Sequence, residues 1–103
     1  MFEPQTPDDY LDLIDQAVFE IEEAMMAAEY EDVSQEDDLS ALLPLLEQLV
    51  SELKKLHGAV HAGVHPFGGG QDLPLMAIVR AWKHRIPVSG LLEAINEVQK
   101  KGF

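Results

Sequence analysis

Apolar residues recur every three or four positions along the first third of the chain, which is the spacing of one face of an α-helix. Thr6 and Pro7 come just before this stripe. Thr6 suits the N-cap of a helix, and Pro7 suits the first helical position. The stripe consists of Tyr10, Leu11, Ile14, Ala17, Val18, Ile21, Ala24, Met25 and Ala28. We therefore predict a helix over residues 7–30, about 36 Å long.

A second apolar stripe follows an acidic connector over residues 31–39. Its members alternate steps of four and three, as in helices that pack along a seam; they are Leu42, Leu46, Leu49, Leu53, Leu56 and Val60. We predict a helix over 40–62 that has Ser40 as its N-cap and Pro44 in its first turn, where a missing N–H costs little. A Gly-rich loop is expected over 64–72, because one proline and three glycines cannot continue a helix.

Two shorter apolar stripes follow the loop. Asp72 is expected to cap a helix over 73–85, and Ser89 to cap another over 90–101, with Gly102 at its C-terminal end. The residues expected to face inward are Leu75, Ile78, Val79, Trp82, Leu91, Leu92, Ile95 and Val98. No segment alternates with period two. We therefore predict an all-α, four-helix bundle-like fold, in which the two short helices cover a long helical hairpin.

Length and composition fit one globular domain over 1–103. The chain has no cysteine, which excludes disulfides, cysteine zinc fingers and thiol catalysis. Its longest apolar run, 75–79, is far too short to span a bilayer, and the opening nine residues lack the basic and apolar parts of a signal peptide. A soluble, cytoplasmic protein without a membrane partner is expected.

The net charge of −12 is distributed unevenly. Residues 1–53 hold 16 of the 19 acidic residues and no lysine or arginine, whereas residues 54–103 hold all seven lysines and arginines. Such asymmetry is typical of a charged interaction surface. It is also compatible with a solvated acidic helix face that the basic half partly neutralises within one fold.

The first predicted helix has a second apolar row opposite its main stripe. Phe19, Met26 and Tyr30 are spaced seven and four residues apart. They share their side of the helix with four carboxylates, Asp12, Asp15, Glu22 and Glu23. Either one of the short helices covers this row, or the row binds a partner helix or a second copy while the carboxylates attract a basic partner.

Three histidines lie four residues apart at the end of the second predicted helix. His57 and His61 would share one helix face, as two ligands of one metal ion require, and imidazole suits Zn or Ni. His65 precedes Pro66, which disfavours helical geometry there, so a third ligand is not assured. The alternative is that both helical histidines are boundary residues of the apolar seam without a metal.

The last two predicted helices have the outline of a helix-turn-helix, with Arg80, Lys83 and Arg85 near the break. The groove-reading helix of such a motif should present basic side chains. The outer face expected for the final helix instead carries Glu93, Asn96, Glu97 and Lys100. Two carboxylates there, and the strongly negative chain, argue against binding to nucleic acid.

The sequence shows no catalytic constellation, because its carboxylates are mostly neighbouring acids in polar stretches and no serine lies in a recognisable triad. We predict a small acidic interaction module, an adapter or regulator without catalytic activity. It is expected to self-associate as a homodimer and to bind a protein partner of basic character. The alternatives are a helical protein that binds Zn or Ni through its histidine pair, and a helix-turn-helix-like nucleic-acid binder.

Overall fold

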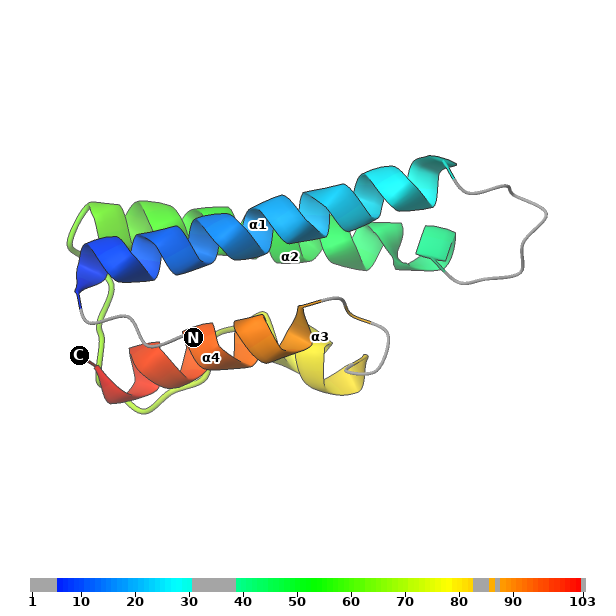
Figure 1. Cartoon of the computed structure of the whole chain (residues 1–103). Coiled ribbons are helices and arrows are strands. Elements are labelled where there is room, and N and C mark those ends of the chain that lie inside the picture. Colours follow the sequence, from blue (N-terminus) through cyan, green and yellow to red (C-terminus); the bar gives the residue numbers. More distant parts are fainter. Residues whose placement is uncertain (1–5, 31–38, 83–85, 87, 103) are drawn as a thin grey trace.

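The computed structural model describes residues 6–30, 39–82, 86 and 88–102, without the side chains of 28–30 and 39–42. The regular elements of these residues are all helices, which confirms the predicted all-α class (Figure 1). The helices are α1 (Pro7–Tyr30), α2 (Leu39–His61), α3 (Met76–Ala81) and α4 (Ser89–Lys101). The predicted connector over 31–39 lies outside the described residues, apart from its last position, which begins α2.

Helix α1 has the predicted bounds. Its start is capped by the hydroxyl of Thr6, which accepts a hydrogen bond from the Asp9 N–H at 3.1 Å. The predicted stripe is the buried side of the helix, and its residues without solvent exposure are Tyr10, Ile14, Ala17 and Ile21. Periodicity and capping therefore agree on this element.

Helix α2 differs from the prediction by one residue at each end. Ser40 lies inside the helix rather than at its N-cap, and Pro44 is an interior residue rather than part of the first turn. Both expectations are wrong for the same reason, namely that the helix already begins at Leu39. The leucine seam is buried as predicted, at Leu46, Leu49, Leu53, Leu56 and Val60.

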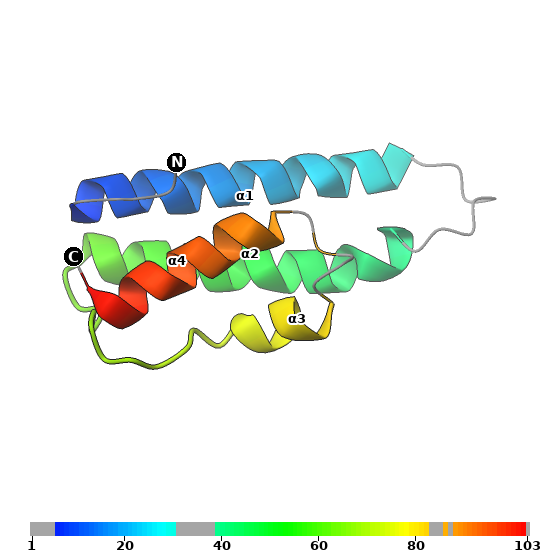
Figure 2. The same cartoon turned by 60° about the horizontal axis from the view of Figure 1, so that its bottom comes forward.

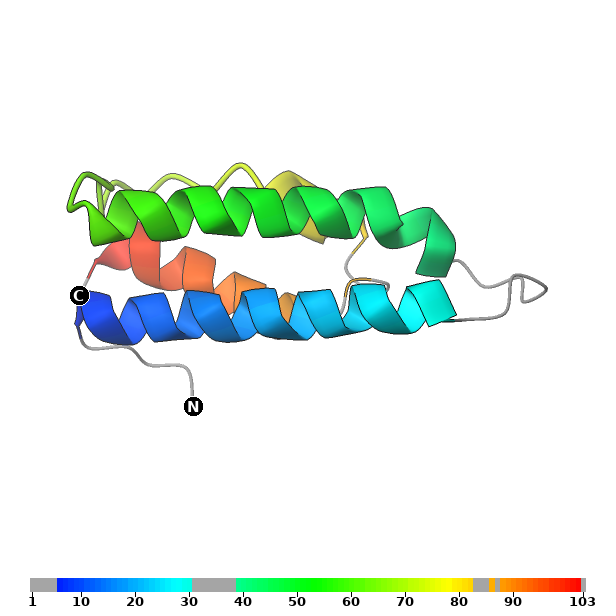
Figure 3. The ribbon, with the colours of Figure 1, turned by 90° about the horizontal axis from the view of Figure 1, so that it is seen from above.

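The helices form two layers. Helices α1 and α2 lie antiparallel and side by side, and α3 and α4 lie on one face of this hairpin (Figures 1 and 2). Seen from above, α4 runs beneath the seam between α1 and α2 (Figure 3). The buried apolar residues of all four helices form one cluster between the layers. In the part of the chain that the structure describes, no element lies on the opposite face of the hairpin.

Helix α3 is much shorter than the predicted 73–85. It begins only after Pro74, which disfavours helical geometry at the preceding residue. Asp72 does not cap it, because its carboxylate is bound elsewhere, and the N-cap position makes no side-chain hydrogen bond. Trp82 was expected to face inward but is 39% exposed, since it occupies the C-cap with non-helical geometry (φ −125°).

Helix α4 agrees with the prediction except at its start. Ser89 is the first helical residue rather than the N-cap, which is Val88 in the left-handed conformation (φ 55°). The carbonyl of Val88 accepts a hydrogen bond from the Leu92 N–H at 2.9 Å. Gly102 ends the helix as expected, with φ 86° and a hydrogen bond from its N–H to the Val98 carbonyl.

Candidate binding surface

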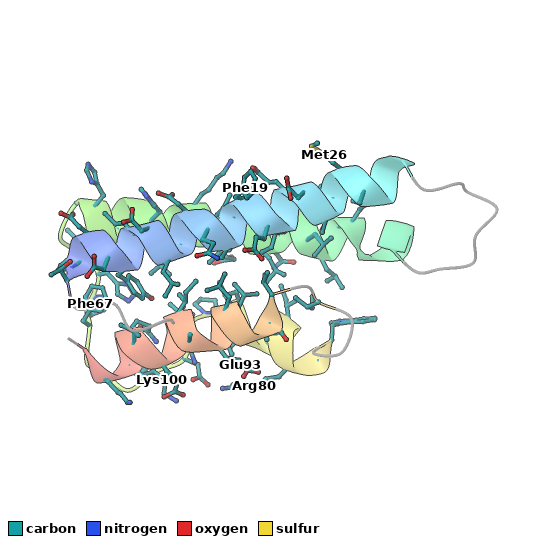
Figure 4. All side chains as sticks on the ribbon, viewed as in Figure 1. Phe19, Met26, Phe67, Arg80, Glu93 and Lys100 are labelled. Carbon is teal, nitrogen blue, oxygen red and sulfur yellow. The ribbon has the colours of Figure 1, made fainter. Side chains whose placement is uncertain are left out.

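Phe19 and Met26 form an apolar ridge on the outer side of α1. They lie seven residues, or two helical turns, apart and are 59% and 55% exposed. Both side chains point away from α4, which packs against the opposite side of α1 (Figure 4). The interpretation in which a short helix covers this side is therefore wrong. Tyr30 ends α1, but its side chain lies outside the described residues.

Carboxylates border this ridge on both sides. Asp15 and Glu22 lie on the side facing α2, where His57 Nε2 is 3.2 Å from Asp15 Oδ1 and Lys54 Nζ is 3.6 Å from Glu22 Oε2. At about 100° per residue, the other two predicted carboxylates fall on the far side of the ridge. These are Asp12 and Glu23, both exposed. The predicted set is thus brought together on one surface, with one border partly neutralised by α2.

The stretch of α2 beside this ridge, residues 54–61, has basic residues and no carboxylate, whereas the exposed Glu47 lies two turns before it on the same side. Lys54, Gly58 and His61 follow one another at spacings of four and three, so they form one row on the helix, and all three are exposed. Lys54 reaches Glu22 across the hairpin, which places the row on the face away from α4. We call this side of the hairpin, formed by the α1 ridge with its carboxylates and by the α2 row, the open face.

The three histidines are not brought together. The rings of His57 and His61 lie nearly parallel, with centroids 6.5 Å apart. His65 lies instead beside α4, with Nε2 3.0 Å from Gln99 Oε1, and its ring packs edge-on against Phe67. Within the described residues no three metal-binding side chains converge. Binding of Zn or Ni by His57 and His61 stays a prediction, one that rests on two imidazoles.

The predicted nucleic-acid residues are only partly described, since Lys83 and Arg85 lie outside the described residues. Arg80 donates to Asp72 through Nη1 at 2.6 Å. This bond, with those from Asn96 and Lys100, holds the pKa of the Asp72 carboxyl well below its usual range and raises the pKa of Arg80. Arg80 is therefore engaged with a carboxylate, and this contact does not add to the case for phosphate binding.

Sequence reasoning missed a buried polar cluster on α4. Asn96 was assigned to the outer face but is only 2% exposed, and Gln99 is also buried. The Asn96 Oδ1 accepts from the Leu73 N–H at 2.8 Å, and the Gln99 Nε2 donates to the Gln71 carbonyl. The spacing of Asn96 and Gln99 from the buried Leu92, at four and seven residues, is the signal that could have revealed them.

A groove of about 340 Å³ lies beside this cluster, between the loop and α4. Its polar residues include His65, Asp72 and Gln99, whose contacts connect them to other residues of the loop and of α4. These contacts hold the loop in place. The groove is therefore explained by the packing of the loop, and the open face is the better candidate for binding.

No helix in the described part of the chain is both long and apolar enough to cross a membrane. Comparison of the chain with protein-family models, with curated proteins and with solved structures finds no match in any of the three.

Proposed function

We propose that this chain is a protein-binding module, an adapter or regulator without catalytic activity, and that it binds its partner through the open face. The observation that carries the proposal is the exposure of Phe19 and Met26, two turns apart on a helix whose opposite side packs into the core. Monomers leave few large apolar side chains grouped on an otherwise charged surface, and such groups favour protein contacts.

The charges around the ridge favour a partner with basic groups. Asp12, Asp15, Glu22 and Glu23 are all exposed on α1, and the first 53 residues contain no lysine or arginine. Complementary charge increases the rate of association with basic groups on a partner. The apolar ridge would then supply the short-range contact, while the carboxylates select which polypeptide reaches it.

The experiment is affinity purification of the tagged chain from its native extract, with quantitative mass spectrometry of the captured proteins. Wild type is compared with the double variant Phe19→Asp, Met26→Asp, which places two charges on the ridge. The matched control is Val64→Asp, because Val64 is 70% exposed at the turn that follows α2, away from the ridge. Circular dichroism confirms that all three chains are folded.

We expect one or more proteins, or untagged copies of the chain itself, to be captured by wild type and by Val64→Asp but not by the ridge variant. The same set of proteins recovered with all three chains would contradict the proposal, because it would show that the ridge takes no part in binding.

A further inference from the structure

We infer that the occupant of the open face is a second copy of this chain, packed hairpin to hairpin as a twofold dimer. This inference rests on the proposed function and specifies its partner. It starts from the division of the open face into an acidic half on α1 and a basic row on α2. Lys54 and His61, which suit the α1 carboxylates, are therefore present on the chain itself, and the exposed Glu47 lies beyond them toward the start of α2.

A twofold axis parallel to the helices would bring these halves together. Such an axis places α1 of one copy over α2 of the other, antiparallel, as in a four-helix bundle. Within one copy, Glu22 lies at the level of Lys54 and Asp15 at the level of His57. The same axis keeps those levels, so the carboxylates of one copy face Lys54 and His57 of the other.

This alignment of the two copies places the Phe19 ring of one copy over a position of the other copy's α2 that has no side chain. Phe19 lies between Asp15 and Glu22 in the sequence, so it meets the other copy's α2 between positions 54 and 57. Helical side chains lean toward the N-terminus of their helix, which for α1 is the direction of the C-terminal end of α2. The Phe19 ring of one copy is thereby directed toward Gly58 of the other.

Gly58 gives an independent reason for this arrangement. Glycine weakens a helix interior, and in the part of the chain that the structure describes nothing requires it here, because a Cβ at Gly58 would meet no atom within 4 Å. Its φ is not in the left-handed region either. An exposed glycine in a helix row allows close approach of another surface. The absent side chain is explained if a bulky ring from a second copy occupies that space.

The test is the oligomeric state of the whole chain, measured by sedimentation equilibrium between about 1 µM and about 1 mM at near-physiological salt, where exposed charges are screened beyond about 8 Å. We expect wild type and Val64→Asp to show a monomer–dimer equilibrium. Phe19→Asp and Gly58→Gln are each expected to raise the dimer dissociation constant by about tenfold or more. Glutamine is a good helix former, so the second variant is expected to fold at least as well as wild type.

Charge exchange tests the arrangement of the two copies. Glu22→Lys and Lys54→Glu each place like charges opposite one another and are expected to be monomeric alone. Mixed in equal amounts they restore both oppositely charged pairs between copies, so a mixed dimer is expected. Circular dichroism shows that each variant is folded before mixing.

A wild-type chain that is monomeric over the whole range would overturn the inference, as would a dimer that Phe19→Asp and Gly58→Gln leave intact. These outcomes differ from failure of the proposed function. A monomeric chain that still captures a basic protein through the ridge would contradict only the second copy as occupant, whereas ridge variants that change neither dimerisation nor capture would contradict both.

Discussion

Asn96 is the side chain on which the loop before α3 depends most directly. Its Oδ1 satisfies the Leu73 N–H at 2.8 Å in a buried site, and its Nδ2 donates to Asp72 at 3.0 Å. Replacing it with alanine leaves that N–H without its acceptor, which costs about 1–3 kcal/mol. We expect Asn96→Ala to lower the free energy of unfolding in urea by this amount. The exposed Glu97→Ala should change it by less than about 0.5 kcal/mol, and equal effects would contradict the assignment.

Asp72 makes the fold sensitive to acid. Its pKa is lowered by hydrogen bonds from Arg80, Asn96 and Lys100, so its stabilising contribution is present above the ordinary carboxyl pKa of about 3.9 and is lost as the pH falls toward the lowered value. We expect Asp72→Asn to lower the Tm at pH 7, and we expect this difference to shrink as the pH falls below 4, with part of it already lost at pH 3. A Tm difference that stays constant between these pH values would show that the charge of Asp72 is not the cause.

Tyr10 shows how one side chain connects two helices. Its ring is fully buried in α1, and its hydroxyl donates to the carbonyl of Ile95 in α4 at 2.8 Å. Burial also raises the pKa of this phenol above its ordinary value. We expect Tyr10→Phe to keep the packing but lose the hydrogen bond, lowering the free energy of unfolding by about 1 kcal/mol. An unchanged urea midpoint would show that the bond does not stabilise the contact between α1 and α4.

At the scale of the elements, a substitution at Gly58 distinguishes the stability of the monomer from the association of two copies. Alanine at this position adds a Cβ that meets no atom of the described residues within 4 Å, and it removes the entropic cost of glycine in a helix. We expect Gly58→Ala to raise the free energy of unfolding of the monomer by about 0.5–1 kcal/mol. The measurement is urea denaturation at low micromolar concentration, where dimers are dilute. A loss of stability there would mean that the site is already occupied within the monomer.

The long helices could be predicted from the sequence, whereas the chain around α3 could not. Helices α1 and α2 have several turns of apolar repeat, which determine the helix type and the buried side together. In contrast, α3 is a six-residue helix whose bounds depend on tertiary contacts. Aspartate is a typical N-cap residue, which is why the sequence suggests that Asp72 caps a helix. In the fold, Asn96 and Arg80 bind its carboxylate instead. Such competition between distant groups leaves no periodic signal.

The candidate surface was predictable in part for the same reason. The ridge of Phe19 and Met26 and the surrounding carboxylates follow from helical spacing alone. Whether another helix covered them depended on where the second layer packs, which the two apolar stripes of the hairpin do not specify. The basic row on α2 became visible only with the Lys54–Glu22 contact, because the relative rotation of two helices is a tertiary property.

At the scale of the whole molecule, the core lies on one side of the hairpin and the excess negative charge lies largely on α1 and its neighbouring segments. Helix α4 covers the inner side of the hairpin with its buried residues Leu92 and Ile95. The outer side of the hairpin keeps its charged residues in solvent. This division leaves a surface that a second layer of helices would complete. It also places many like charges close together in a chain of only 103 residues.

That repulsion gives a prediction for the folded chain as a whole. A net charge of −12 opposes compaction, and added salt screens it, since the Debye length falls from about 30 Å at 0.01 M to about 3 Å at 1 M. The exposed Lys54–Glu22 pair contributes little in the opposite direction. We therefore expect the Tm to rise with NaCl, and to rise less in the variant Asp12→Asn, Glu23→Gln. A Tm that falls with salt in both chains would mean that local ion pairs outweigh the repulsion.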